Sequence, residues 1–183
     1  MKALKIVLLL LISLAILAAN SVLNPEKTIS DKVAEKEDLS TLLTALEAAD
    51  LVEVFKSEGP YTVFAPTNKA FNNLPKGKLE SLLKAENKEE LIKILKYHVF
   101  AGKIHAGDIG EETMIETLEG TQLKLTAQSS AGEYMGDEVQ AMNKVMVNNA
   151  IVIEADIMAS NGVIHIIDGV VMPTDMEVLG AKD

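Results

Sequence analysis

The sequence predicts an α+β fold with a mainly antiparallel system of β-strands. In the first half of the chain, apolar residues recur at spacings of three and four, which is typical of short amphipathic helices. From Thr113 onward the period changes to two, which indicates strands joined as hairpins. Because helical and strand patterns do not alternate regularly along the chain, a doubly wound parallel sheet is not expected.

The first residues have the pattern of a secretory signal peptide. Lys2 and Lys5 precede a largely apolar run, and Ala15 and Ala18 have the spacing of an A-x-A cleavage site. We therefore expect a signal peptide over residues 1–18 and a secreted, extracellular or periplasmic protein. The alternative is a retained membrane anchor, although the run is shorter than the ~20 apolar residues that a spanning helix needs.

The rest of the chain has the length of one ordinary domain with a single sizeable core. Residues 19–36 are polar, contain Pro25 and show no sustained period, so we expect them to form a linker. The domain itself is expected over residues 37–175, followed by a C-terminal tail over residues 176–183.

Charge narrows the range of partners. All 17 basic residues are Lys, and 27 acidic residues outnumber them, so the formal net charge is −10. Such a surface repels phosphate backbones and anionic membranes, and without Arg the chain lacks the usual bidentate ligand of phosphate and guanine. Nucleic acid is therefore not an expected partner, and a membrane is expected only through an uncleaved N-terminal segment.

The sequence contains no Cys. An exported chain without Cys has no disulfide framework, so burial and hydrogen bonds must stabilise the fold. Cys nucleophiles and thiolate metal sites are excluded for the same reason.

Five short helices are predicted before residue 98. Their predicted first residues or N-caps are Asp38 or Ser40, Asp50, Thr67, Lys78 and Asn87. Asn87 and Glu90 have the spacing of a capping box. The helix that they open places Leu91, Ile94 and His98 on one apolar stripe, so we expect His98 to be buried.

Strands are predicted between and after these helices. Tyr61–Ala65 is a short strand that Pro66 ends, and Glu119-Gly120 is the turn between strands over residues 113–118 and 123–127. Residues 128–143 are polar and glycine-bearing, which predicts an exposed loop before strand character returns at Val145.

The last hairpin is predicted around Asn161-Gly162, a pair that favours a two-residue type I′ turn between apolar β-formers. This turn pairs Ser160 with Val163, Met158 with His165, Ile157 with Ile166 and Asp156 with Ile167. One face is apolar enough for a core and consists of Ile151, Ile153, Ala155, Ile157, Ile164 and Ile166. The other face is mixed and consists of Val152, Glu154, Asp156, Met158, Val163, His165 and Ile167.

Three segments together resemble the fasciclin (FAS1) domain family. Tyr61–Pro75, YTVFAPTNKAFNNLP, resembles the first signature of the family, and Asn161–Pro173, NGVIHIIDGVVMP, resembles its second. Tyr97-His98 lies between them and resembles the family's Tyr-His motif. The match extends over nearly the whole domain, residues 37–175.

The resemblance implies a wedge or sandwich of two mainly antiparallel sheets with several short helices packed around it. It also implies a secreted or cell-surface protein, without enzymatic activity, that mediates cell adhesion or extracellular protein interaction. A cell-surface or matrix protein or a polysaccharide is then the expected partner. The alternatives are an extracellular binding module for a small molecule or polysaccharide and, third, a hydrolase.

No residue pattern predicts a cofactor, a metal centre or a catalytic site. His98 and His165 are interpreted as structural, and His105 as a surface residue. Asp156 lies diagonal to His165 in the predicted register, within range of an Asp-His hydrogen bond, but the sequence places no Ser beside the pair. The acidic positions do not have the spacing of a Ca²⁺ cage and are interpreted as a solvated face: Glu111, Glu112, Glu116, Glu119, Asp137 and Glu138.

The candidate binding residues come from the family resemblance. Tyr97 and His98 match the Tyr-His motif, and Asp156-Ile157 resembles the short Asp-Ile motifs linked to integrin-type recognition. Ala155 stands where the adhesive version has Pro, which predicts that the strand continues without interruption. We therefore expect His98 and Ile157 to be structural, and Tyr97 and Asp156 to be the contact residues.

Overall fold

The computed structural model describes residues 27–129 and 143–173. The predicted signal peptide, the C-terminal tail and most of the predicted loop 128–143 lie outside the described residues. Within the described ranges, no helix combines the length and the hydropathy that crossing a bilayer requires.

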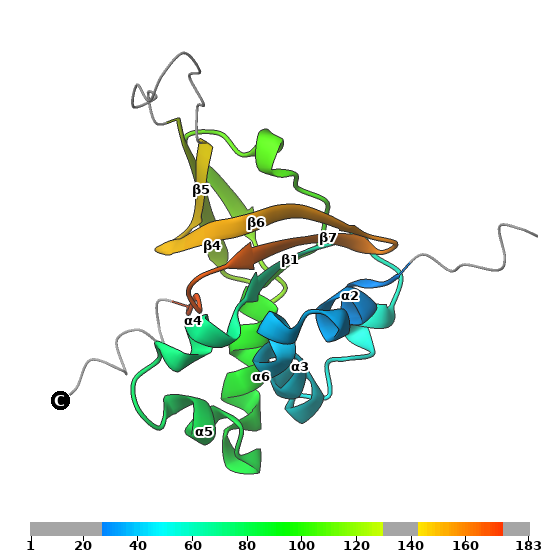
Figure 1. The fold of residues 1–183 in the computed structure, drawn as a ribbon, viewed down its shortest axis with the longest axis vertical. Helices are drawn as coiled ribbons and strands as arrows, with labels where there is room; N and C mark the ends of the chain where they lie inside the picture. Colours follow the sequence, from blue (N-terminus) through cyan, green and yellow to red (C-terminus); the bar gives the residue numbers. More distant parts are fainter. Residues whose placement is uncertain (1–26, 130–142, 174–183) are drawn as a thin grey trace, which may run out of the picture.

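Helices account for most of the secondary structure before residue 98, as predicted. Figure 1 shows the α-helices gathered on one side of the strands β1 and β7. The helical segments are α2 (Ile29–Glu35), η1 (Glu37–Leu39), α3 (Ser40–Ala48), η2 (Val54–Lys56), α4 (Asn68–Asn72), α5 (Lys78–Leu82), η3 (Ala85–Asn87), α6 (Lys88–Tyr97) and η4 (Ala106–Asp108).

The strands form a seven-stranded sheet in the order β2-β1-β7-β6-β5-β4-β3. They are β1 (Tyr61–Pro66), β2 (Val99–Phe100), β3 (Thr113–Glu116), β4 (Gln122–Ser129), β5 (Asn143–Val147), β6 (Ala150–Ala159) and β7 (Gly162–Ile167). Every pairing is antiparallel except that of β1 with β7. The predicted α+β class and the mainly antiparallel pairing are therefore confirmed.

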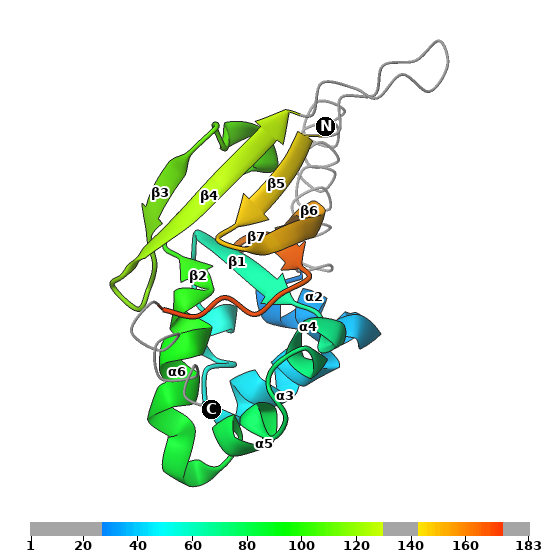
Figure 2. The same cartoon turned by 90° about the vertical axis from the view of Figure 1, so that its left-hand side faces the viewer.

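The sheet has two parts joined by a short pairing between β5 and β6, which involves only Met146 with Ile151 and Val147 with Ala150. Figures 1 and 2 show β3, β4 and β5 turning away from β6 and β7 on the side opposite the helices. This is the wedge that the family resemblance implies.

Strand β7 separates two apolar cores and is buried along its whole length. The helical core lies between the helices and the sheet and includes Ile29, Val33, Leu46, Phe55, Val63, Ala65, Leu95, Ile164 and Ile166. The sheet core lies inside the wedge and includes Phe64, Tyr97, Ile115, Leu123, Leu125, Val147 and Ile167. The mixed face predicted for β7 is therefore a second buried face, because the other half of the sheet covers it.

The predicted register of the last hairpin is wrong by two residues. The two-residue loop is Ser160-Asn161, so Met158 pairs with Val163 and Ile157 pairs with Ile164. The reason is that Gly162 belongs to the strand, where β1 approaches too closely for any side chain: a Cβ there would lie 2.1 Å from the carbonyl oxygen of Tyr61. Strand β7 ends at Ile167.

The offset of two residues leaves the core-facing set of the hairpin tip unchanged, because side chains alternate with a period of two. Ile164 and Ile166 are buried in the helical core, and Ile157 packs against it, as predicted. Upstream, two register shifts between Val152 and Ile157 interrupt the alternation. As a result Ile153, predicted to face the core, is 58% exposed.

The linker predicted over residues 19–36 is wrong where the structure describes it. Residues 29–35 form α2, and Ile29 and Val33 are buried in the helical core. Thr28 begins this helix with a capping box to Asp31. The Thr-x-x-Asp spacing and the i, i+4 pair of Ile29 and Val33 were the sequence signals for this helix.

The predicted N-caps are partly correct. The hydroxyl of Thr67 accepts a hydrogen bond from the backbone N–H of Ala70, as predicted. The N-cap positions of α3 and η2 are instead Leu39 and Glu53, and neither side chain forms a capping hydrogen bond. The caps predicted at Asp38 or Ser40 and at Asp50 are therefore wrong. The predicted capping box at Asn87 is also wrong, because that amide donates to the carbonyl of Ser81 near the end of α5.

Candidate functional site

Asp156 lies at a bulge in β6, not in the regular strand that Ala155 predicts. Its φ is +57°, and the register of β6 against β7 shifts between Glu154 and Ile157. The Asp156 side chain is 42% exposed, and its carboxylate accepts a hydrogen bond from the backbone N–H of Ala106 at 3.0 Å. The bulge therefore presents a carboxylate at the protein surface.

The predicted hydrogen bond between the Asp156 carboxylate and His165 is wrong. His165 Nδ1 instead accepts the backbone N–H of Asp156, and Nε2–H donates to the carbonyl of Ile104. The Asp156 carboxylate lies 3.3 Å from Nδ1 of His105, which was predicted to be a surface residue and whose side chain is 44% exposed. His165 is structural, as predicted: it is 1% exposed and stacks on Phe64 with ring centroids 5.6 Å apart.

Tyr97, predicted as a contact residue, is 2% exposed and belongs to the sheet core. Its hydroxyl donates to the carbonyl of Gln122 and accepts from the side-chain amide of Asn148. This prediction is wrong, because a receptor could reach the ring only if the wedge opened. The hydroxyl thus connects the end of α6 to β4 and to the turn after β5.

His98 is buried, as the helical stripe predicts, and both of its ring nitrogens contact backbone groups. Nδ1–H donates to the carbonyl of Ile94 at 2.7 Å, and Nε2 accepts the N–H of Val171 at 3.1 Å. Burial lowers the pKa of His98 to about 4, and the hydrogen bond to Ile94 raises it in partial opposition. The imidazole is therefore neutral at physiological pH and connects α6 to the segment after β7.

The buried His98 predicts that the free energy of unfolding falls on acidification between about pH 6.5 and pH 4. An unfolded His binds its proton near pH 6.5, whereas folded His98 binds it near pH 4. Unfolding therefore takes up a proton in this window, and the stability that His98 contributes above pH 6.5 is lost as the pH falls. The expected loss is about 3 kcal/mol, measured by urea denaturation across the pH range.

Two further measurements help to assign the effect to His98, because burial also lowers the pKa of His165 and acts in the same direction. The His105→Gln variant is the control for the loss of a histidine that is not buried, since the His105 side chain is 44% exposed. In NMR spectra, the ring of His98 should remain neutral from pH 7 to pH 5. A titration midpoint for His98 above pH 6 would contradict the prediction.

Asn161, interpreted from the sequence only as a turn former, is a buried connector of three segments. Its Oδ1 accepts the N–H of Ile29 at 2.9 Å, and its Nδ2 donates to the carbonyls of Phe55 and Ser57 at 2.8 and 2.9 Å. Its backbone carbonyl accepts the N–H of Tyr61. The side chain thus fixes α2 and the segment from η2 to Ser57 against the hairpin tip, and the backbone carbonyl adds the start of β1.

The acidic side chains that the structure describes do not converge on a cation site. No group of three or more His, Cys, Asp or Glu side chains that could hold a metal ion occurs within residues 27–129 and 143–173. Glu112 forms an ion pair with Lys124, and Glu119 accepts from Thr121. Asp137 and Glu138 lie outside the described residues.

Most of the chain is similar to other known proteins. It is 48% identical to protein sll1483 of Synechocystis sp. over 80% of this chain and 73% of that protein. It is 40% identical to pig transforming growth factor-beta-induced protein ig-h3, and there the match covers 81% of this chain but only 20% of the relative. The chain thus corresponds to one part of that longer protein.

The fold has a counterpart among solved structures. A FAS1 domain pair from the insect cell adhesion molecule Fasciclin I matches with a TM-score of 0.68 at 17% sequence identity, over 82% of this chain and 52% of that one. The family model of the Fasciclin domain matches residues 37–173. The chain therefore belongs to the fasciclin domain family.

Proposed function

We propose that this protein is a secreted or cell-surface adhesion module that binds an extracellular protein or polysaccharide and has no enzymatic activity. The observation that carries the proposal is the bulge at Asp156, which places a carboxylate at the surface of a fasciclin domain. The exposed side chains of Ile153 and Met158 flank it on the same strand. A carboxylate between exposed apolar side chains suits protein contact, because it supplies both a charge and apolar area.

The positions of the histidines support a non-catalytic role. A general base needs a ring nitrogen available to its substrate. Both nitrogens of His98 and of His165 instead contact backbone groups. His105 approaches the carboxylate of Asp156, but among the described residues no Ser or Thr hydroxyl forms a hydrogen bond with it. This arrangement disfavours a hydrolase.

The proposal predicts that Asp156→Asn weakens cell attachment without unfolding the protein. Asn tolerates the positive φ at this position and removes only the charge. We expect at least about twofold fewer cells attached to a surface coated with the variant, because a carboxylate makes stronger, charge-assisted hydrogen bonds than an amide. Attachment is counted at matched coating density, and the melting temperature is measured alongside.

Asp38→Asn is the matched control, because Asp38 is exposed in η1. It should support attachment like the wild type. If cells attach to Asp156→Asn as well as to the wild-type protein, the contact lies elsewhere on the surface. No attachment to the wild-type protein above an inert coating would overturn the adhesion proposal itself.

A further inference from the structure

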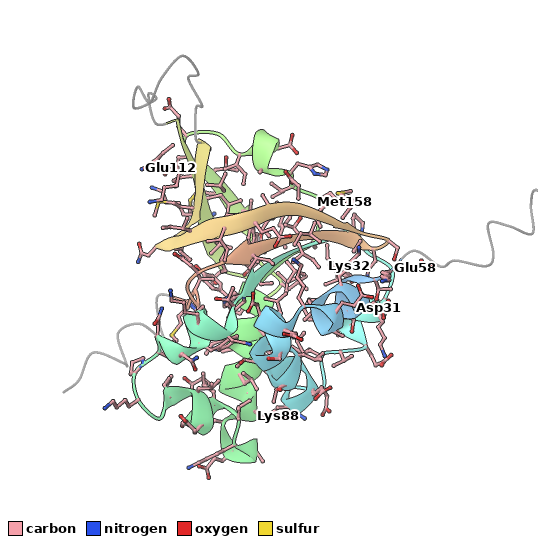
Figure 3. All side chains as sticks on the ribbon, in the orientation of Figure 1. Asp31, Lys32, Glu58, Lys88, Glu112 and Met158 are labelled. Atoms are coloured by element: carbon pink, nitrogen blue, oxygen red, sulfur yellow. The ribbon has the colours of Figure 1, made fainter. Side chains whose placement is uncertain are left out.

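Two adjacent hollows flank the tip of the β6–β7 hairpin, and neither is lined by Asp156, Tyr97 or His98. The first has a volume of about 490 Å³ and the second of about 390 Å³. Lys103 and Ser160 line both, so the hollows meet along these two residues. Figure 3 shows Lys32, Glu58 and Met158 around this end of the hairpin.

The lining of these hollows has the opposite charge to the chain as a whole. Four lysines contribute to it, namely Lys27, Lys32, Lys56 and Lys103, whereas Glu58 is the one carboxylate among the described lining residues. The whole sequence has 27 acidic residues against 17 Lys. A concentration of positive charge in hollows on an acidic protein favours a ligand with negative charge.

Carboxylates at the edge balance only part of this charge. Lys27 forms an ion pair with Glu35, and Lys56 forms one with Glu53. The charges of both lysines also act on the carboxylate of Asp31. Within the described residues, no ion pair involves Lys32 or Lys103. These two ammonium groups are therefore the ones that a ligand would engage.

The other lining groups suit a sugar chain better than a compact anion. Ser160 carries a hydroxyl where the two hollows meet, and Met158, which is 50% exposed, gives the second hollow an apolar surface. A sugar ring presents hydroxyl groups at its edge and C–H groups on its faces, so it uses both kinds of surface. Lys suits charges spaced along such a chain, because its ammonium is a point charge on a flexible stem.

We propose that these joined hollows bind a segment of an acidic polysaccharide, with Lys32 and Lys103 contacting its carboxylate or sulfate groups. The inference rests on the proposed function, since it names the partner class of an extracellular interaction module. A membrane or a nucleic acid fits less well, because both present an extended anionic surface to a protein with a net charge of −10.

The test measures binding of the purified protein to short dextran sulfate, polygalacturonate and neutral dextran by isothermal titration calorimetry. We expect binding to one or both charged chains, with an affinity that falls as salt increases. Dextran sulfate and polygalacturonate separate sulfate from carboxylate recognition. Equal binding to neutral dextran, no binding to either charged chain, or equally tight binding to phosphatidylserine vesicles would overturn the proposal.

Variants of the lining should move the affinity in opposite directions. Lys32→Gln/Lys103→Gln should weaken binding at least about fivefold, whereas Glu58→Gln should tighten it about twofold, because it removes a repulsion. The matched control is Lys69→Gln/Lys76→Gln, which makes the same change in net charge at exposed positions in and near α4. An equal loss of affinity in the control would overturn the site, since total charge would then explain the binding.

The result separates this inference from the adhesion proposal, because the titration contains no cells. If the charged chains bind and the lining variants behave as expected while cells do not attach, the polysaccharide site in the joined hollows is supported and the adhesion proposal is contradicted. If cells attach but Lys32→Gln/Lys103→Gln binds the charged chains like the wild type, only the polysaccharide site is contradicted.

Discussion

Asn161→Ala should lower the free energy of unfolding by roughly 2–6 kcal/mol, since it removes two buried hydrogen bonds and each buried partner left unsatisfied costs about 1–3 kcal/mol. The Asn161 side chain is the common partner of the Ile29 N–H and of the carbonyls of Phe55 and Ser57. Ala fills none of these roles, and Asn161 is only 9% exposed. Urea denaturation at neutral pH measures the loss.

Asn161→Asp tells a hydrogen-bond connector from a simple turn former. Asp is as good a turn residue as Asn, yet its carboxylate would face the two carbonyl oxygens that Nδ2 now contacts. We therefore expect Asp to be at least as destabilising as Ala. Asn72→Ala, at the exposed end of α4, is the control and should change stability little. A stable Asp variant would show that the turn alone requires Asn161.

Ile166→Ala should lower the free energy of unfolding by about 2–5 kcal/mol, the usual cost of a large-to-small change in a core. Ile166 is 4% exposed, lies in the helical core and pairs with Ala65 of β1. The cavity would lie beside β7. The backbone of this strand is paired with β1 on one side and with β6 on the other, so it cannot collapse into the cavity. Chemical denaturation provides the measurement.

Ile153→Ala is the matched control for Ile166→Ala. The sequence pattern assigns both residues to one apolar face, but Ile153 is 58% exposed. Its truncation should cost less than about 1 kcal/mol, as for most surface changes. Similar losses in the two variants would mean that the bulge in β6 does not separate them.

Local patterns predicted the elements whose side chains alternate or recur without interruption. The turn at Glu119-Gly120 and the stripe that buries His98 depend only on such spacing, and the structure confirms both. The bulge at Asp156 has no such spacing signal: Asp is disfavoured in strands and tolerates a positive φ, but these preferences do not fix where the register shifts. The side chain of Asp156 meets Ala106 and His105, which are about 50 residues away, so local pattern could not place it.

The candidate site was hardest to predict where two neighbouring residues are buried for different reasons. His98 continues the helical stripe of α6, and this stripe alone would leave the adjacent Tyr97 exposed. The helix ends at Tyr97, however, and β4 covers its far side, so the two residues enter different cores. Only the packing of the second half of the chain against the first reveals this. The lysines that line the two joined hollows are also far apart in the sequence, so they form no local pattern.

The parallel pairing of β1 with β7 determines the order in which the molecule can fold. Tyr61 pairs with Gly162, about 100 residues later in the chain, so closing this contact requires nearly the whole domain. The helices made first by the ribosome cannot complete their core until Ile164 and Ile166 have emerged. The helices therefore stay without a complete core until nearly the whole domain has been synthesised.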